Sequence, residues 1–310
     1  MKHTIGITYG FYSGQWIGHN TNHLFELLKA SFGGIDADVQ KIGLLDTRVE
    51  IFDNHLSVKN IITGENIGDV AGVYFANWRS QPEFALAIAE TMKRQGKPIL
   101  SEEVLQVVPM TKLGELVLLS DKDLLLPDSV FMRNKHWLKL LKTDAELPFA
   151  FPFIMKVING SMGVDNFLVE SREQLKEIVS KDKEVLFVAQ EFIPNTHDFR
   201  IIVMGGEPKL VIKRSRINDD THLNNTSQGA AGELIPLDKV DPVILDLAVR
   251  AANAVKRPSF SGVDVIQHTE TGEYYILEVN KTPQMETGTN TNEKVHALTS
   301  YFSNKLEASA

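Results

Sequence analysis

The stretch GVDVIQHTETGEYYILEVNKTPQ, residues 262–284, places three oxygen-bearing side chains inside otherwise apolar runs: Asp264, Glu278 and Asn280. A carboxylate among apolar neighbours costs free energy unless a partner compensates it. Two alternating segments flank the turn-forming sequence TETGE, which predicts a β-hairpin. The question is therefore what this hairpin binds.

The expected register of the hairpin brings the two acids together. If His268 faces Tyr274 across the turn, Asp264 faces Glu278, and alternation places Asn280 on the same face as Glu278. Like charges on facing positions repel each other, so the pattern indicates a cation between them. Ligands that are all oxygens suit magnesium or manganese. The alternative is a solvated hairpin whose acids are unrelated.

Composition excludes several classes of protein. The 310 residues include 32 basic and 40 acidic ones, a net charge of -8, which argues against a nucleic-acid-binding surface. Cysteine is absent, which excludes disulfides, thiolate metal sites and cysteine nucleophiles. The first residues do not form a signal peptide, and no apolar run has the length of a membrane span. We expect a soluble, cytoplasmic protein.

The pattern of elements changes along the chain. The first hundred residues alternate strand and helix patterns, which predicts an α/β region, with a hairpin that turns at Asp53-Asn54. After Pro152, strands joined by short turns dominate, interrupted by two helical segments, SREQLKEIVSKD and DPVILDLAVRAANAVKR. This half predicts an antiparallel α+β fold. No G-x-G-x-x-G follows the first strand, so a dinucleotide site is poorly supported.

Two further segments could contact an anion. Lys156 lies within the apolar strand FIMKVI and precedes the loop NGSMG, whose backbone N–H groups could approach phosphate oxygens. The hairpin around Gly205-Gly206 carries four cations at its open end: Arg200, Lys213, Arg214 and Arg216. Cations so close together call for anions between them. An edge lysine and a solvated face are the alternatives.

Two more segments carry a weaker signal. The strand VLFVAQ runs into EFIPN, and a strand-to-linker junction of this kind exposes backbone groups that could bind an adenine edge; a plain strand end is the alternative. The polar loop HLNNTSQGAAGE could close over a ligand.

In this order the motifs resemble the ATP-grasp superfamily, and within it the RimK-like carboxylate–amine ligases. The resemblance covers roughly residues 98–290 and includes QEFI, DFR, KRSR, NNTSQGAAG and GVDVI…LEVNKTP. It implies an α/β pre-ATP-grasp domain (1–107), a central ATP-grasp lid domain (108–188) and a C-terminal ATP-grasp domain (189–310) with antiparallel sheets. His222-Leu223-Asn224 departs from the family's Arg-Ser-Asn, and Gln284 replaces its usual Gly, so the acceptor site departs from the pattern.

The resemblance also implies roles for residues. The residues expected to contact ATP are Lys112, Lys156, Gly160, Ser161, Met162, Gly163, Gln190, Glu191, Phe192, Ile193, Asp198 and Asn224. Arg200 and Arg214 are expected near the substrate and the acyl phosphate. Asp264, Glu278 and Asn280 are expected to bind two Mg²⁺ ions, with Mn²⁺ as an alternative.

The implied reaction joins a carboxylate to an amine through an acyl phosphate and yields ADP and phosphate. The expected substrates are small molecules of the amino-acid or peptide type, and homo-oligomerisation is left open. A phosphotransferase or carboxylase with a non-amine acceptor is one alternative, and a non-catalytic nucleotide-binding protein is another.

Overall fold

The structure is a computed structural model. It describes residues 3–9, 25–26, 37–107, 111–143, 145–158, 166–181, 185–215, 231–281, 283, 285 and 289–307. The chain forms two compact units. The first comprises Met1–Ser120, Asp128–Asn159 and Val169–Gln190, and the second comprises Asp121–Pro127, Gly160–Leu168 and Glu191–Ala310.

The first unit begins with a parallel sheet, as the α/β pattern predicts. Its four strands are ordered β2-β1-β5-β6, namely β2 (Ala37–Gly43), β1 (His3–Tyr9), β5 (Gly72–Asn77) and β6 (Ile99–Leu100). The buried side chains of Ile7, Tyr9 and Val39 pack together here. Helix α2 (Pro82–Arg94) begins with a proline, which suits the first turn of a helix, and contacts β5.

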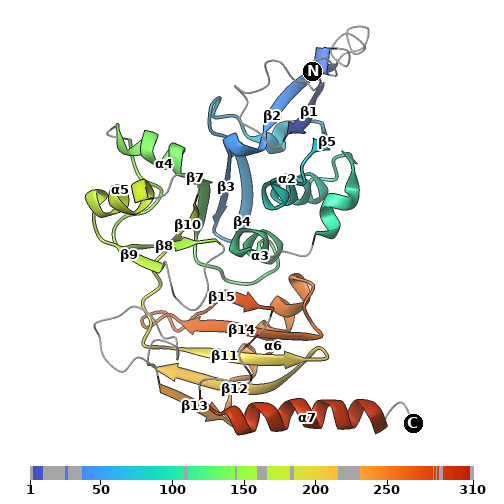
Figure 1. Ribbon diagram of the computed structural model, residues 1–310, viewed down its shortest axis with the longest axis vertical. Coiled ribbons are helices and arrows are strands. Elements are labelled where there is room, and N and C mark those ends of the chain that lie inside the picture. The colour runs from blue at the N-terminus through green and yellow to red at the C-terminus, as the bar shows by residue number, and fades with distance from the viewer. Residues whose placement is uncertain are drawn as a thin grey trace. The chain divides into compact units, whose positions relative to one another are not determined.

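A second sheet of the first unit combines strands from distant parts of the sequence (Figure 1). Five of its strands follow the order β4-β3-β7-β10-β8, namely β4 (His55–Asn60), β3 (Thr47–Phe52), β7 (Ser129–Arg133), β10 (Leu186–Glu191) and β8 (Phe153–Val157). The predicted turn between β3 and β4 is confirmed, because Asp53 and Asn54 have φ values of 47 and 63°, as a tight hairpin turn requires.

This region contains one more strand and three more helices. They are β9 (Asn166–Val169) and the helices α3 (Lys112–Leu119), α4 (Asn134–Leu141) and α5 (Arg172–Lys181). Thr111 caps α3 by accepting a hydrogen bond from the Gly114 N–H group. Asn134 is the first helical residue of α4, and Arg133 occupies the cap position.

The proposed three-domain division stays a prediction. The structure changes unit between Gln190 and Glu191, close to the predicted boundary before residue 189. However, β3 lies in the predicted first domain and pairs with β7 of the predicted second domain. The sheet therefore crosses the boundary expected at residue 107.

The second unit is built on an antiparallel sheet, as predicted, which we call sheet C. Its order is β13-β12-β11-β14-β15 (Figure 1), with β13 (Ala231–Ile235), β12 (Glu207–Ser215), β11 (His197–Met204), β14 (Phe260–Gln267) and β15 (Tyr274–Asn280). Helices α6 (Pro242–Ala254) and α7 (Thr291–Glu307) contact strands of this sheet. Gly205 and Gly206 form the β11–β12 turn with φ values of 61 and 82°, which glycine adopts without strain.

The two faces of sheet C differ in chemistry. Val211, Val263 and Val279 are fully buried on one face. Helix α6 contacts β11, β12, β14 and β15, and we assign it to this valine face because α7 packs beside Ile202 and Met204 on the other. Alternation places Arg200, Arg214 and Asp264 on the face opposite the valines. Within the described residues, no helix is both long and apolar enough to cross a membrane.

Candidate active site

The hairpin that opens the sequence analysis has the predicted pairing at its functional end. Asp264 pairs with Glu278 across β14 and β15, which confirms the expected neighbours. The predicted pairing of His268 with Tyr274 is wrong, because Gln267 faces Tyr274. The register shifts between Asp264 and Val265, which leaves Leu277 as the extra residue of a β-bulge on β15. A regular ladder from this turn would place Leu277 opposite Asp264. The bulge shifts the pairing by one residue, so that Glu278 faces Asp264 as predicted.

Asp264 lies at the centre of a buried network. The Arg200 guanidinium donates from Nε to Oδ1 of Asp264 at 2.8 Å and from Nη2 to Oδ2 at 2.7 Å. Nη2 of Arg214 lies 3.1 Å from Oδ2, and the Asn280 amide donates to the same oxygen at 3.4 Å. Asp264 is only 5% exposed. Two arginines therefore supply the positive charge that a buried carboxylate needs.

A second carboxylate shares one of these arginines. Arg214 donates from Nε and Nη2 to the two carboxylate oxygens of Asp198, at 2.5 and 2.9 Å. Both residues are buried. The sheet register creates these pairs directly, because Asp198 faces Arg214 across β11 and β12, and Arg200 faces Asp264 across β11 and β14. The guanidinium of Arg214 thus bridges Asp198 and Asp264.

The unequal sharing of arginines gives the two acids different titration behaviour. Burial raises the pKa of Asp264, but Arg200 and Arg214 together lower it to about 2. Burial raises the pKa of Asp198 to about 6, because Arg214 offsets the burial only in part and Asp264 adds like charge. Burial alone would lower the pKa of Arg214, but Asp264 and Asp198 raise it. Asp264 and Arg214 are therefore charged at neutral pH.

The cations predicted at the open end of the β11–β12 hairpin do not all share one face of the sheet. Lys213 faces Phe199 and lies on the valine side of the sheet, since successive residues of a strand point to opposite faces. Burial and then Lys213 lower the pKa of His197 there. Arg216 lies outside the described residues. Anions were expected between Arg200 and Arg214, and carboxylates of the chain itself take this place.

The residues expected to contact the nucleotide are described only in part. Lys112 begins α3, and its backbone N–H group donates to the Ile158 carbonyl at 3.2 Å. Lys156 is half-buried on β8. Gly160, Ser161, Met162, Gly163 and Asn224 lie outside the described residues. Contacts of all these residues with ATP stay predictions.

The strand-to-linker junction shows how Gln190 is used. The Gln190 side chain is buried and donates to the Ser129 hydroxyl at 3.0 Å, so it ties β10 to β7. Glu191 ends β10 and is exposed, and Phe192 and Ile193 follow it. A role of this junction in adenine binding would therefore fall to its backbone, as the sequence predicts, and not to the Gln190 amide.

Sequence reasoning missed the bond between Asp198 and Arg214. Asp198 was expected to contact ATP and Arg214 to lie near an acyl phosphate, whereas each engages the other in the structure. Among the described residues, no group of three or more His, Cys, Asp or Glu side chains is close enough to hold a metal ion. The predicted metal set has two acids and one amide, so it does not form such a group.

Comparison with known proteins gives the family. The RimK-like ATP-grasp domain matches residues 111–298. Curated relatives include a probable alpha-L-glutamate ligase of Cellvibrio japonicus, 25% identical over 211 residues and 67% of either chain, and one of Aliivibrio fischeri, 25% identical over 227 residues and 72% of either chain. A relative from Syntrophotalea carbinolica is 26% identical over 56% of either chain. The match thus spans between about half and three quarters of these relatives.

Solved structures were compared as well. A D-alanine–D-alanine ligase from Bacillus anthracis covers 99% of this chain and 98% of its own, with 14% identity and a TM-score of 0.48. The ATP-grasp ligase PsnB with a minimal precursor covers 96% and 99%, with 16% identity and a TM-score of 0.43.

The domain match and the ligase names of the curated relatives confirm the predicted enzyme class, an ATP-dependent ligase that joins a carboxylate to an amine. The chain belongs to the RimK-like ATP-grasp family.

Proposed function

We propose that this ligase activates an amino-acid-type carboxylate as an acyl phosphate on the charged face of sheet C and transfers it to an amine. The observation that carries the proposal is the buried pairing of Arg200 and Arg214 with Asp264, beside Glu278 and Asn280. L-Glutamate is the first candidate substrate, because the curated relatives are named probable alpha-L-glutamate ligases.

The donor set fits magnesium. Asp264 and Glu278 face each other on adjacent strands, and the Asn280 amide lies 3.4 Å from Asp264. Two carboxylates and an amide oxygen are hard ligands of the kind that Mg²⁺ prefers. These three residues would hold the ion or ions. When bound, magnesium supplies positive charge that offsets the charge of the polyphosphate. Two ions, and Mn²⁺ as a substitute, are part of the proposal.

Arg200 would have to share Asp264 with that cation. Its two bonds occupy both oxygens of the carboxylate. A phosphate group offers a guanidinium an alternative bidentate acceptor. We therefore expect Arg200 to move from Asp264 to phosphate oxygens when nucleotide arrives, which leaves the carboxylate available to the metal. Arg214, held by both Asp198 and Asp264, would stay in place.

The chain's own residues then act by position and charge. A carboxylate oxygen of the substrate attacks the γ-phosphorus, the bond to the bridging oxygen breaks, and ADP leaves. The nitrogen of the amine attacks the acyl carbon, and phosphate leaves as the nitrogen loses a proton. Arg200 and Arg214 stabilise the negative charge on the acyl phosphate. Lys112, Lys156 and the predicted loop Gly160–Gly163 would hold the polyphosphate.

The test is product analysis. The protein is incubated with ATP, Mg²⁺ and L-glutamate, with and without a panel of amino acids and short peptides as amines. Phosphate release and product masses are then measured. The proposal predicts phosphate release that depends on the amine, and a product heavier than the amine by one acyl group. A phosphorylated product without any amine would instead indicate a phosphotransferase.

Composition supports the remaining parts of the proposal. The net charge of -8 favours small-molecule partners over nucleic acid, and the absence of cysteine is consistent with a cytoplasmic location.

A further inference from the structure

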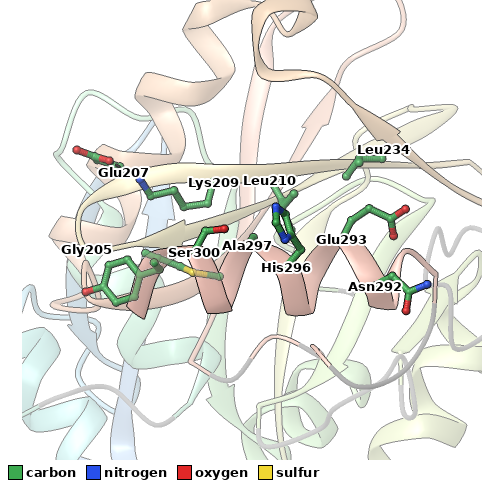
Figure 2. A pocket seen from close by; sticks show the side chains of 12 residues that line it. Gly205, Glu207, Lys209, Leu210, Leu234, Asn292, Glu293, His296, Ala297 and Ser300 are labelled. Atoms are coloured by element: carbon green, nitrogen blue, oxygen red, sulfur yellow. Dashed lines mark hydrogen bonds and ion pairs between the residues drawn. The ribbon is translucent and has the colours of Figure 1, made fainter. Parts of the chain in front are cut away.

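A groove of about 730 Å³ lies between sheet C and α7 (Figure 2). Its sheet side includes Lys209, Leu210 and Leu234, and its helix side includes Glu293 and His296. A volume of this order is typical of pockets that bind small organic molecules. Leu210 lies four residues along β12 from Arg214, about 13 Å at the rise of a strand. The groove is therefore a separate place on the same face.

One residue is directed into the groove by an irregularity of the sheet. Ile202 pairs with Leu210, but Val203 pairs with Pro208, so Lys209 is the extra residue of a β-bulge. A bulge re-aims a side chain that regular alternation would have placed elsewhere. Lys209 lines the groove, and its Nζ lies 2.5 Å from Oε2 of Glu207, which also lines the groove and has a side chain that is 69% exposed. An exposed ion pair, with Lys209 as its cation, thus lies at one end of the groove.

A negative charge lies at the other end. Tyr301 packs against the turn at Gly205, which places the later part of α7 beside the β11–β12 turn and Lys209. Glu293 lies eight residues earlier, about 12 Å along a helix axis. Glu293 and His296 point from α7 toward the strands in Figure 2. Within the described residues, neither side chain makes a hydrogen bond or an ion pair.

The space between the charges is apolar. Leu210 and Leu234 from the sheet, and Ala297 from α7, line the groove and are half-buried. An occupant that matches this surface has an ammonium group, an apolar middle and a carboxylate. The charges of a free amino acid lie too close together to reach both ends. The charged termini of an extended tripeptide are about 10 Å apart, given about 3.5 Å per residue.

We propose that this groove binds a short peptide with free termini, its ammonium group at Glu293 and its carboxylate at Lys209. An apolar central side chain would contact Leu210, Leu234 and Ala297, and His296 would lie beside the peptide backbone. The inference goes beyond the proposed ligation, because it concerns a site on this face that is separate from the arginine network. It also holds without turnover, so its failure is distinct from a failure of the ligase assignment.

The experiment measures binding by calorimetry to the whole protein without ATP or magnesium. The probes are the tripeptide Ala-Leu-Ala, its N-acetylated form, its C-amidated form and free leucine. We expect saturable binding of the unmodified tripeptide, and binding about fivefold weaker when either terminus is blocked, as the loss of one exposed charge pair predicts. Free leucine should bind more weakly than any of the peptides.

Matched variants locate the site. Glu293→Gln and Lys209→Met should each weaken tripeptide binding about fivefold. Glu270→Gln and Lys239→Met should leave it unchanged, because these residues are exposed, lie in the same unit and do not line the groove. Lys239 also pairs with a neighbouring acid, Asp238, so it matches Lys209 in that respect.

An active-site control distinguishes the groove from the arginine network. Arg200→Gln should leave tripeptide binding unchanged, whereas a peptide bound as a ligation product beside the arginine network would lose affinity. The proposal is overturned if the tripeptide shows no saturable binding at millimolar concentration, if blocked and free termini bind equally, or if Arg200→Gln weakens binding while Glu293→Gln does not.

Discussion

Both faces of sheet C contain buried residues, and the two sets of residues are stabilised in opposite ways. On one face, valines pack with a helix and need no partners, since they carry no polar atoms. On the other face, Asp198, Arg214 and Asp264 are equally hidden, and each needs the others. Apolar packing of the same volume is often as stable as a buried ion network or more so. The charged face is therefore explained by its chemistry and not by stability.

The largest expected effect follows from removing a proposed metal ligand on the charged face. Glu278→Ala and Asp264→Asn should each abolish product formation, a loss of at least about a thousandfold in kcat, while the fold is kept. Product mass measured over a range of magnesium concentrations, with circular dichroism for the fold, checks this. Turnover near that of the wild type in limiting magnesium would show that these residues do not bind the ion.

Next in size is the loss of the shared guanidinium. Arg214→Met leaves Asp198 and Asp264 buried with too little positive charge, and should lower the free energy of unfolding by about 3–5 kcal/mol. Urea denaturation monitored by fluorescence gives the value. A change below about 1 kcal/mol would mean that the two carboxylates do not depend on this arginine.

The pH dependence of stability separates the two acids, and we expect its slope to change in Asp198→Asn. The pKa of Asp198 in the folded protein is about 6, above its ordinary value of 3.8. Its contribution to stability is thus full below pH 3.8 and is lost as pH rises through 6. Asp264 has the opposite sign, because its pKa of about 2 means that stability is lost as pH falls through that value.

Unfolding free energies measured with a chelator between pH 4 and 7 test this assignment. The wild type should gain stability from Asp198 as pH falls through 6, and Asp198→Asn should lack that component. Equal slopes in the two proteins would contradict the raised pKa.

A smaller effect concerns competition for Asp264. Arg200→Gln removes a cation that occupies both carboxylate oxygens, so magnesium should bind about tenfold more tightly in the absence of nucleotide. Calorimetry with Mg²⁺ alone measures this. Weaker metal binding in the variant would show that Arg200 supports the ion and does not compete with it.

The smallest expected effect lies on the valine face. Ile201 is fully buried there, and Ile201→Val should cost only about 0.5–1.5 kcal/mol with no change in magnesium affinity or kcat. The same denaturation and activity assays serve as the measurement. A loss of activity without a loss of stability would mean that the two faces are coupled.

The sequence predicts the strands and the chemistry of the charged face better than it predicts which residues face each other across the strands. Alternation places Arg200 on the same face as Asp198, and it correctly indicates a hairpin around Asp264 and Glu278. It does not reveal that Asp198 faces Arg214. A regular register from the Gly205-Gly206 turn would place Lys213 opposite Asp198.

Bulges account for this difference, since both hairpins of the site contain one extra residue, Lys209 on β12 and Leu277 on β15. Each bulge shifts the pairing by one position beyond it. Nothing in the alternation of apolar and polar residues marks these positions in advance. The parts of the nucleotide site that lie outside the described residues stay predictions from the resemblance.

The extra residue Leu277 separates the loop tip at residues 268–273 from the acids beyond it. Without it, a loop of this length would rotate Glu278 toward the valines, where a carboxylate has no partner. The loop between the two strands can thus be irregular while Glu278 keeps its orientation toward the charged face. Leu277 therefore sets the register of β15 beyond the loop. Its deletion should lower kcat, although Leu277 itself lies outside the charged face.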